Sequence, residues 1–88
     1  MTHNGKEVRI VYLALPDGVC GAANEDDDYY LVVINQSLAD ITKRRALGHE
    51  LCHVFRDHLA GDRPIREVEE EADRLAWDYY RAYRDNRL

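Results

Sequence analysis

The stretch GHELCH, residues 48–53, contains residue types that can hold a metal ion and activate water. His49 and His53 are four residues apart, so on an α-helix they lie about 40° apart on one face. Two neutral imidazoles at that spacing can bind one Zn²⁺ ion, and a catalytic zinc site uses three protein ligands plus a water. Glu50 lies at the edge of this face, where its carboxylate can reach that water as a general base. The motif therefore predicts a zinc site with Glu50 as the catalytic residue, rather than two surface histidines on an ordinary helix.

The helix that carries this motif, expected over Ile41–Leu59, also has an apolar face that can pack on a sheet. Its members are Leu47, Leu51, Val54 and Phe55. His58 falls within this apolar stripe, so we expect it to be a partly buried core histidine and not a ligand. Cys52 falls off both faces and is expected to be a bystander, and His3 lies in an expected N-terminal tail without a role.

A third metal ligand must come from elsewhere, and a second helix, expected over Pro64–Asp85, offers carboxylates. Its apolar stripe at helical spacing consists of Ile65, Val68, Ala72, Leu75, Ala76, Tyr79 and Tyr83. Glu70 points almost opposite this stripe and is excluded. Glu69 and Glu71 flank the stripe on opposite sides, and periodicity alone does not choose between them.

Two features favour Glu69 as the third ligand. Asp73 lies one turn further along the same flank, where a carboxylate can accept the N–H of a ligating histidine. Trp77 and Tyr80 continue that flank, so we expect it to be covered. Glu71 as the ligand, and Asp73 as a direct ligand, remain alternatives. Asp57, one turn after His53, is either a further support of a histidine or a solvated acid at the helix end.

The residues before the first helix read as strands. Val8–Leu15 and Tyr29–Asn35 are rich in β-branched residues, and Val19–Asn24 is a weaker candidate between two turns. Ser37 or Asp40 is the expected N-cap of the first helix. We therefore expect an α+β fold, with a small antiparallel sheet of about three strands followed by two helices. The 88 residues are enough for a single domain, residues 1–88.

Composition excludes several classes of partner and compartment. The net charge of −5 and the pI near 5.2 argue against nucleic acid and anionic membrane surfaces, both of which need a basic face. No apolar run approaches the length of a membrane span, and no signal peptide is visible. Two cysteines in such a chain are expected to be free thiols, and the expected compartment is the cytoplasm.

Taken together, the motifs resemble a known family. The helix with RRALGHELCH, the acidic VEEEAD and EEEADRLA on the next helix, and the strand YYLVVIN are similar to the ImmA/IrrE-type zinc metallopeptidases, among the gluzincin-like zincins. In that family the first glutamate of an E-x-E-A-N or E-x-E-A-H motif is the third zinc ligand, which maps onto Glu69. The polar residue four positions on maps onto Asp73. The resemblance implies a minimal zincin-like domain with Zn²⁺ as its cofactor, without the extra domains of longer members.

The function expected from these patterns is metal-dependent hydrolysis of a peptide bond in a protein or peptide substrate. An extended substrate could lie along a sheet edge, and the resemblance implies a phage or mobile-element repressor as one substrate class. Oxyanion donors are sought among Tyr29, Tyr30, Tyr79, Tyr80 and the arginines, with none preferred. The alternative is a catalytically inactive zincin-fold regulator that binds a partner protein. A purely structural zinc site is disfavoured because it needs no base at Glu50.

Overall fold

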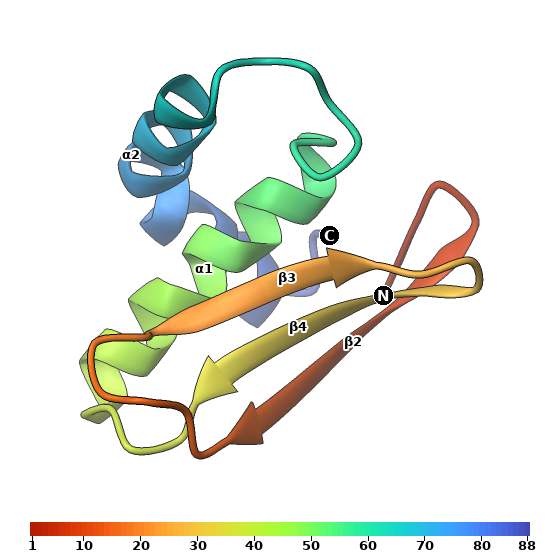
Figure 1. The fold of residues 1–88 in the computed structure, drawn as a ribbon. Helices are drawn as coiled ribbons and strands as arrows, with labels where there is room; N and C mark the ends of the chain where they lie inside the picture. The colour runs from red at the N-terminus through yellow and green to blue at the C-terminus, as the bar shows by residue number, and fades with distance from the viewer.

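The computed structural model describes all 88 residues as one four-stranded sheet and two helices (Figure 1). The elements are β1 (Thr2–His3), β2 (Lys6–Leu13), β3 (Gly21–Glu25), β4 (Tyr29–Asn35), α1 (Asp40–Phe55) and α2 (Ile65–Arg84). The α+β class is confirmed, with one strand more than the three expected. Neither helix combines the length and the apolar character that crossing a membrane would require.

The sheet has the order β1-β2-β4-β3 and is mixed, so the expectation that all its strands are antiparallel is wrong. β2 and β4 are parallel neighbours, and β3 pairs antiparallel with the other side of β4. β4 is the most apolar strand and takes a central position, while the chain between β2 and β3 passes to its far side. The buried Asn35 fixes this crossing, because its Nδ2 donates to the carbonyl of Val19 at 2.9 Å.

β1 forms a hairpin with β2 that the sequence reading placed in a tail. Asn4 and Gly5 have φ angles of 52° and 75°, which is the positive-φ pair of a two-residue hairpin turn. The hairpin is attached to the end of α1, since His3 Nε2 lies 2.8 Å from Asp57 Oδ1 and Asn4 Nδ2 donates to the same oxygen at 2.9 Å. Asp57 therefore serves this attachment and takes no part in a metal site.

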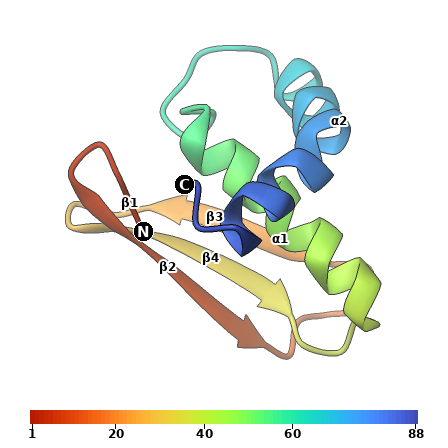
Figure 2. The ribbon, with the colours of Figure 1, turned by 180° about the vertical axis from the view of Figure 1, so that it is seen from behind.

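The core lies between β4 and α1, which itself lies between the sheet and α2 (Figures 1 and 2). Alternate residues of β4 face inward and meet the apolar stripe of α1. These buried residues are Tyr30, Val32 and Ile34 from β4 and Leu47, Leu51 and Val54 from α1. The opposite face of α1 is therefore left for α2 and for the histidines.

α1 and α2 cross at very short range through small residues. A Cβ atom on Gly48 would lie only 1.8 Å from the carbonyl oxygen of Ala76, so no larger residue fits there. Ala72 and Ala76 are fully buried at the same contact. The short distance between the helices lets carboxylates of α2 reach the imidazoles of α1.

α1 ends at Phe55, four residues before the expected Leu59. Asp57 has a φ of 56°, its N–H donates to the carbonyl of Val54, and the N–H of His58 donates to that of His53. This pair of bonds is a Schellman motif, which reverses the chain. At the other end Ala39 is the N-cap, without a side-chain bond, and Asp40 is the first helical residue. Neither Ser37 nor Asp40 caps the helix as expected.

Candidate metal centre

Three donor groups from two helices, two imidazole nitrogens and one carboxylate, converge at one point. His49 Nε2 lies 3.0 Å from Glu69 Oε2 and 3.1 Å from His53 Nε2, and His53 Nε2 lies 3.2 Å from Glu69 Oε1. Ligands of a tetrahedral zinc ion at bond lengths of about 2.0–2.1 Å are separated by about 3.3–3.4 Å. The donors are thus within a few tenths of an ångström of the spacing that zinc needs, and two imidazoles with one carboxylate are a donor set that zinc accepts.

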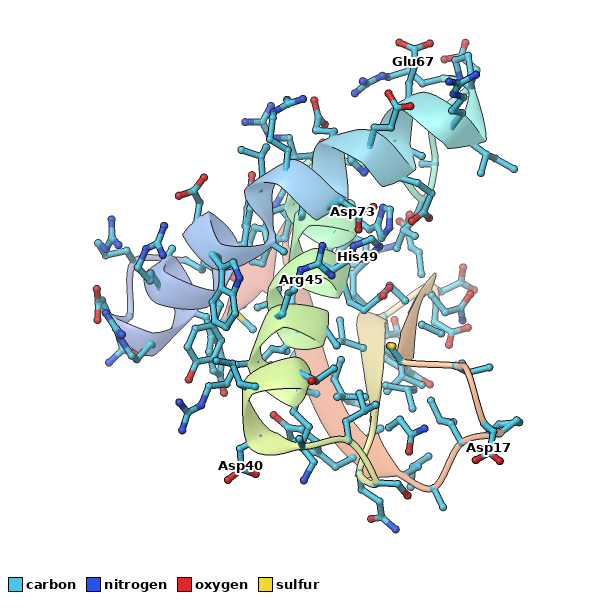
Figure 3. All side chains as sticks on the ribbon, turned by 90° about the vertical axis from the view of Figure 1, so that its left-hand side faces the viewer. Asp17, Asp40, Arg45, His49, Glu67 and Asp73 are labelled. Carbon is cyan, nitrogen blue, oxygen red and sulfur yellow. The ribbon has the colours of Figure 1, made fainter.

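Asp73 lies on the other side of His49 from these donors. Its Oδ1 is 2.9 Å from Nδ1 of His49, where a carboxylate can accept the ring N–H and direct Nε2 toward the donor cluster. Arg45 donates to the same carboxylate at 3.4 Å. Figure 3 shows His49, Asp73 and Arg45 gathered at the meeting of the two helices. This position matches a supporting role for Asp73 and not that of a direct ligand.

Glu50 is buried beside the donor cluster, with its side chain 10% exposed and Oε2 4.0 Å from His49 Nε2. Burial raises the pKa of its carboxyl to about 7; the His49 ring opposes this increase and the Glu69 charge adds to it. Gly21 of β3 packs directly on Glu50, since a Cβ there would lie 3.3 Å from Glu50 Cγ. A carboxyl group with a pKa near neutrality can both accept and donate a proton.

His53 is buried as well, which favours its neutral form. Burial lowers the pKa of His53, partly offset by the negative charge of Glu69. Neutral imidazole is the form that binds a metal ion.

A second cluster of potential ligands lies behind His53 and consists of Cys52, His58 and Glu71. His58 Nε2 lies 2.6 Å from Glu71 Oε1, and His58 Nδ1 lies 2.9 Å from His53 Nδ1. Glu71, the alternative third ligand, therefore contacts His58 and not the donor atoms of the first cluster. The hydrogen bond from His58 lowers the pKa of Glu71 and keeps it a carboxylate.

His58 is buried, as expected, with its side chain 1% exposed, but it contacts His53 instead of the apolar core. This contact was not predicted from the sequence, because the helix was expected to continue past Phe55. Cys52 is fully buried, and burial raises the pKa of its thiol to about 11.

The donor cluster opens into a cleft of about 690 Å³. The cleft is bounded by β3 with the loop before it, by α1 and by the first turns of α2, and His49, Glu50, His53 and Glu69 all line it. None of the six tyrosines does, and Arg45 is the one arginine in the lining. Tyr79 instead accepts a hydrogen bond from Arg56 at 3.1 Å, away from the cleft.

The other acidic residues at the start of α2 lie outside the site. Glu70 pairs with Arg66 at 3.2 Å in solvent, as its helical phase predicts. Figure 3 shows Glu67 near the far end of the helix, away from His49.

Comparison with known proteins gives one match. No curated protein and no solved structure is significantly similar to the chain. The Peptidase_M78 family, described as the IrrE N-terminal-like domain, matches residues 5–83, which include α1, all but the last residue of α2 and the whole donor cluster. The chain therefore belongs to the IrrE N-terminal-like domain family of peptidases.

Proposed function

We propose that the protein is a zinc-dependent peptidase that hydrolyses peptide bonds in the cleft beside β3. The observation that carries this proposal is the convergence of two imidazole nitrogens and the Glu69 carboxylate at 3.0–3.2 Å, with the buried carboxyl of Glu50 beside them. Structural zinc sites are closed by four protein ligands, whereas catalytic sites use three and keep one position open. Here three donors face a cleft.

The residues present fit zinc, which His49, His53 and Glu69 would hold. When bound, the ion supplies Lewis-acid polarisation of the scissile carbonyl and acidifies a water molecule. Glu50 accepts the proton of the attacking water and passes it to the leaving amine, a transfer that its position beside the donor cluster allows. Asp73 holds the ring of His49, so that Nε2 stays directed at the ligand position.

The edge of the sheet offers a place for an extended substrate. β3 is the outermost strand and pairs only with β4, and its residues Gly21, Ala22 and Ala23 line the cleft. An extended peptide can add to such an edge through main-chain hydrogen bonds. Arg45 is the cationic donor within this cleft and the candidate to stabilise negative charge on the substrate carbonyl. The proposed substrate is a regulatory protein, with phage and mobile-element repressors as the first class to test.

Two measurements test the proposal. The first is the zinc content of the purified chain and of His49→Ala; we expect one ion per chain and loss of that ion in the variant. The second is cleavage of candidate repressors by the wild type, by Glu50→Gln and by the control Glu70→Gln. Glu50→Gln should retain zinc and lose about 10²–10⁴-fold in rate, because it lacks the proton acceptor. Glu70→Gln should cleave like the wild type.

The same measurements separate this proposal from a non-catalytic regulator. A regulator would bind its partner protein and alter its activity equally well with Glu50 or Gln at position 50. Cleavage that persists in Glu50→Gln, or a wild-type chain without bound zinc, contradicts the peptidase.

A further inference from the structure

On the Nδ1 side of His53, opposite its proposed ligating nitrogen, a series of hydrogen bonds links three side chains. His53 Nδ1 is 2.9 Å from His58 Nδ1, and His58 Nε2 is 2.6 Å from Glu71 Oε1. The His58 side chain is only 1% exposed and the Glu71 side chain 14%. Both polar side chains are thus largely buried; His58 is among the residues that line the cleft, and Glu71 is not.

Metal binding would determine which ring nitrogen carries the proton in His53 and in His58. His53 can ligate through Nε2 only if that nitrogen carries the lone pair, so its proton sits on Nδ1. The Nδ1–H then donates to Nδ1 of His58, which must carry a lone pair. The proton of His58 is consequently on Nε2 and donates to the Glu71 carboxylate. A doubly protonated His58 would force His53 into the tautomer that cannot ligate.

We propose that His58 and Glu71 are positioning residues of the metal centre, which hold His53 in its Nδ1–H tautomer and aim its Nε2 at the ion. This proposal rests on the proposed site at His49, His53 and Glu69. The two ligating histidines would then be supported differently. His49 meets a carboxylate directly through Asp73, whereas His53 reaches one through an intervening imidazole.

The fold supplies this support through the end of α1. The Schellman motif at Asp57 turns the chain back, so that the imidazole of His58 lies against that of His53, with ring centroids 5.1 Å apart. Glu71 is held by two arginines as well, because Arg63 lies 3.3 Å from the same oxygen, Oε1, and Arg56 lies 3.8 Å from Oε2. The orientation of His53 thus depends on the connection between the two helices.

The alternative use of this cluster, as a second metal site with Cys52, does not fit these contacts. Both nitrogens of His58 already have partners within the chain of hydrogen bonds. A ligand role for His58 would require breaking its bond to His53 or its bond to Glu71.

The test is the zinc dissociation constant, measured by competition with a chromophoric chelator. Loss of a hydrogen-bonding partner behind a ligating histidine typically costs 10–100-fold in metal affinity, so we expect about that loss in His58→Ala. His58→Gln should recover most of it, since the amide oxygen can accept from His53 and the amide nitrogen can donate to Glu71. Glu71→Ala should weaken zinc binding, and the neighbouring control Glu70→Ala should not.

Nitrogen-15 NMR of the histidine rings in the zinc-loaded wild type provides a second readout that does not depend on variants. We expect His53 as the Nδ1–H tautomer and His58 as the neutral Nε2–H tautomer. A doubly protonated or Nδ1–H His58, or zinc affinity in His58→Ala equal to that of the wild type, overturns the proposal while leaving the peptidase intact. A wild-type chain that binds no zinc overturns both.

Discussion

Glu50 and Cys52 are two residues apart on α1, and burial affects their acidity in the same direction with different chemical results. The carboxyl pKa rises to about 7, which brings Glu50 into the range where it can exchange protons at neutral pH. The thiol pKa rises to about 11, which keeps Cys52 protonated. The thiolate is the reactive and metal-binding form of cysteine. Burial therefore makes Cys52 unreactive, although it brings the pKa of Glu50 close to neutral pH.

The raised pKa of Glu50 predicts a pH dependence of stability in the zinc-free protein. Between pH 4.5 and about 7 the folded protein retains a proton that the unfolded chain releases, so this contribution favours folding at low pH and is lost as the pH rises. Glu50→Gln has no such proton. Its free energy of unfolding relative to the wild type should therefore increase from pH 4.5 to pH 8, by at most about 3 kcal/mol.

Urea unfolding at several pH values in the presence of a chelator measures this difference. Glu70→Gln is the matched control, because Glu70 pairs with Arg66 in solvent and its change should be small at every pH. A difference between the wild type and Glu50→Gln that does not vary with pH would contradict the raised pKa.

The two cysteines should differ sharply in reactivity. Cys20 is exposed and Cys52 is fully buried, with a thiol whose pKa is about 11. At pH 8 a thiol reagent should modify one cysteine rapidly and the second only as fast as the protein opens, whereas both react at once in denaturant. Cys20→Ser should lack the rapid phase. Rapid modification of two thiols in the folded wild type would contradict the burial of Cys52.

At the scale of the elements, helical phase is informative wherever the helix is regular. It places His49 and His53 on one face of α1, and Glu69 and Asp73 on the flank of α2 that meets them. These four residues lie well inside their helices, where each residue adds a fixed rotation of 100°. For this reason spacing identified His49 and His53 and reduced the third ligand to Glu69 or Glu71. The neighbouring Asp73 on the flank of Glu69, together with the resemblance on the second helix, then favoured Glu69.

Helical phase no longer predicts side-chain positions beyond the end of the helix. Likewise, the alternation of apolar and polar residues in a strand does not predict the order of the strands in the sheet. His58 was assigned to the apolar stripe as though α1 continued, but the left-handed Asp57 turns the chain back and brings His58 onto His53. The pattern of apolar residues says which face of a strand is inward but not which strand is its neighbour, so the parallel pairing of β2 with β4 was missed. The Asn4–Gly5 pair was a signal for the first hairpin that was not used.

The close crossing of the helices at Gly48 predicts that one added methyl group weakens zinc binding more than it weakens the fold. In Gly48→Ala the added Cβ would lie 1.8 Å from the carbonyl oxygen of Ala76, so α2 must move away and take Glu69 and Asp73 with it. We expect a loss of about 1–3 kcal/mol in stability from overpacking, despite the better helix propensity of alanine. The free energy of zinc binding should decrease by much more than the free energy of unfolding, since two of the residues around His49 are displaced.

Gly61→Ala is the matched control for this change. It adds the same methyl group in the connection between the helices, where the nearest atom is 3.3 Å away and a small adjustment can accommodate it. Denaturant unfolding and chelator competition on both variants measure the two effects. Wild-type zinc affinity in Gly48→Ala would show that the close crossing does not set the geometry of the site.

For the whole molecule, the small core means that a metal ion bound at the candidate centre would contribute to stability as well as to chemistry. Only 16 of the 88 residues are buried, and α2 contributes just Val68, Ala72 and Ala76 to them. α2 packs mainly on α1, and its Tyr79 and Tyr80 pack against the core between α1 and the sheet. The donors His49 and His53 come from α1 and Glu69 from α2, so an ion held by all three would connect the two helices across their crossing.

This connection predicts that zinc raises the thermal stability of the entire domain. A ligand that binds the folded state alone stabilises it by about 2.7 kcal/mol at a free concentration of 100 times its dissociation constant. In a domain of this size that corresponds to a rise in melting temperature of about 10–20 °C, less any binding of zinc to histidines of the unfolded chain. Circular dichroism melting curves with buffered zinc and with excess chelator measure the shift. His49→Ala should melt at one temperature in both conditions, whereas Glu50→Gln, which keeps all three donors, should show the full zinc-dependent rise. Equal melting temperatures of the wild type with zinc and with chelator would mean that the three donors do not hold an ion between the helices.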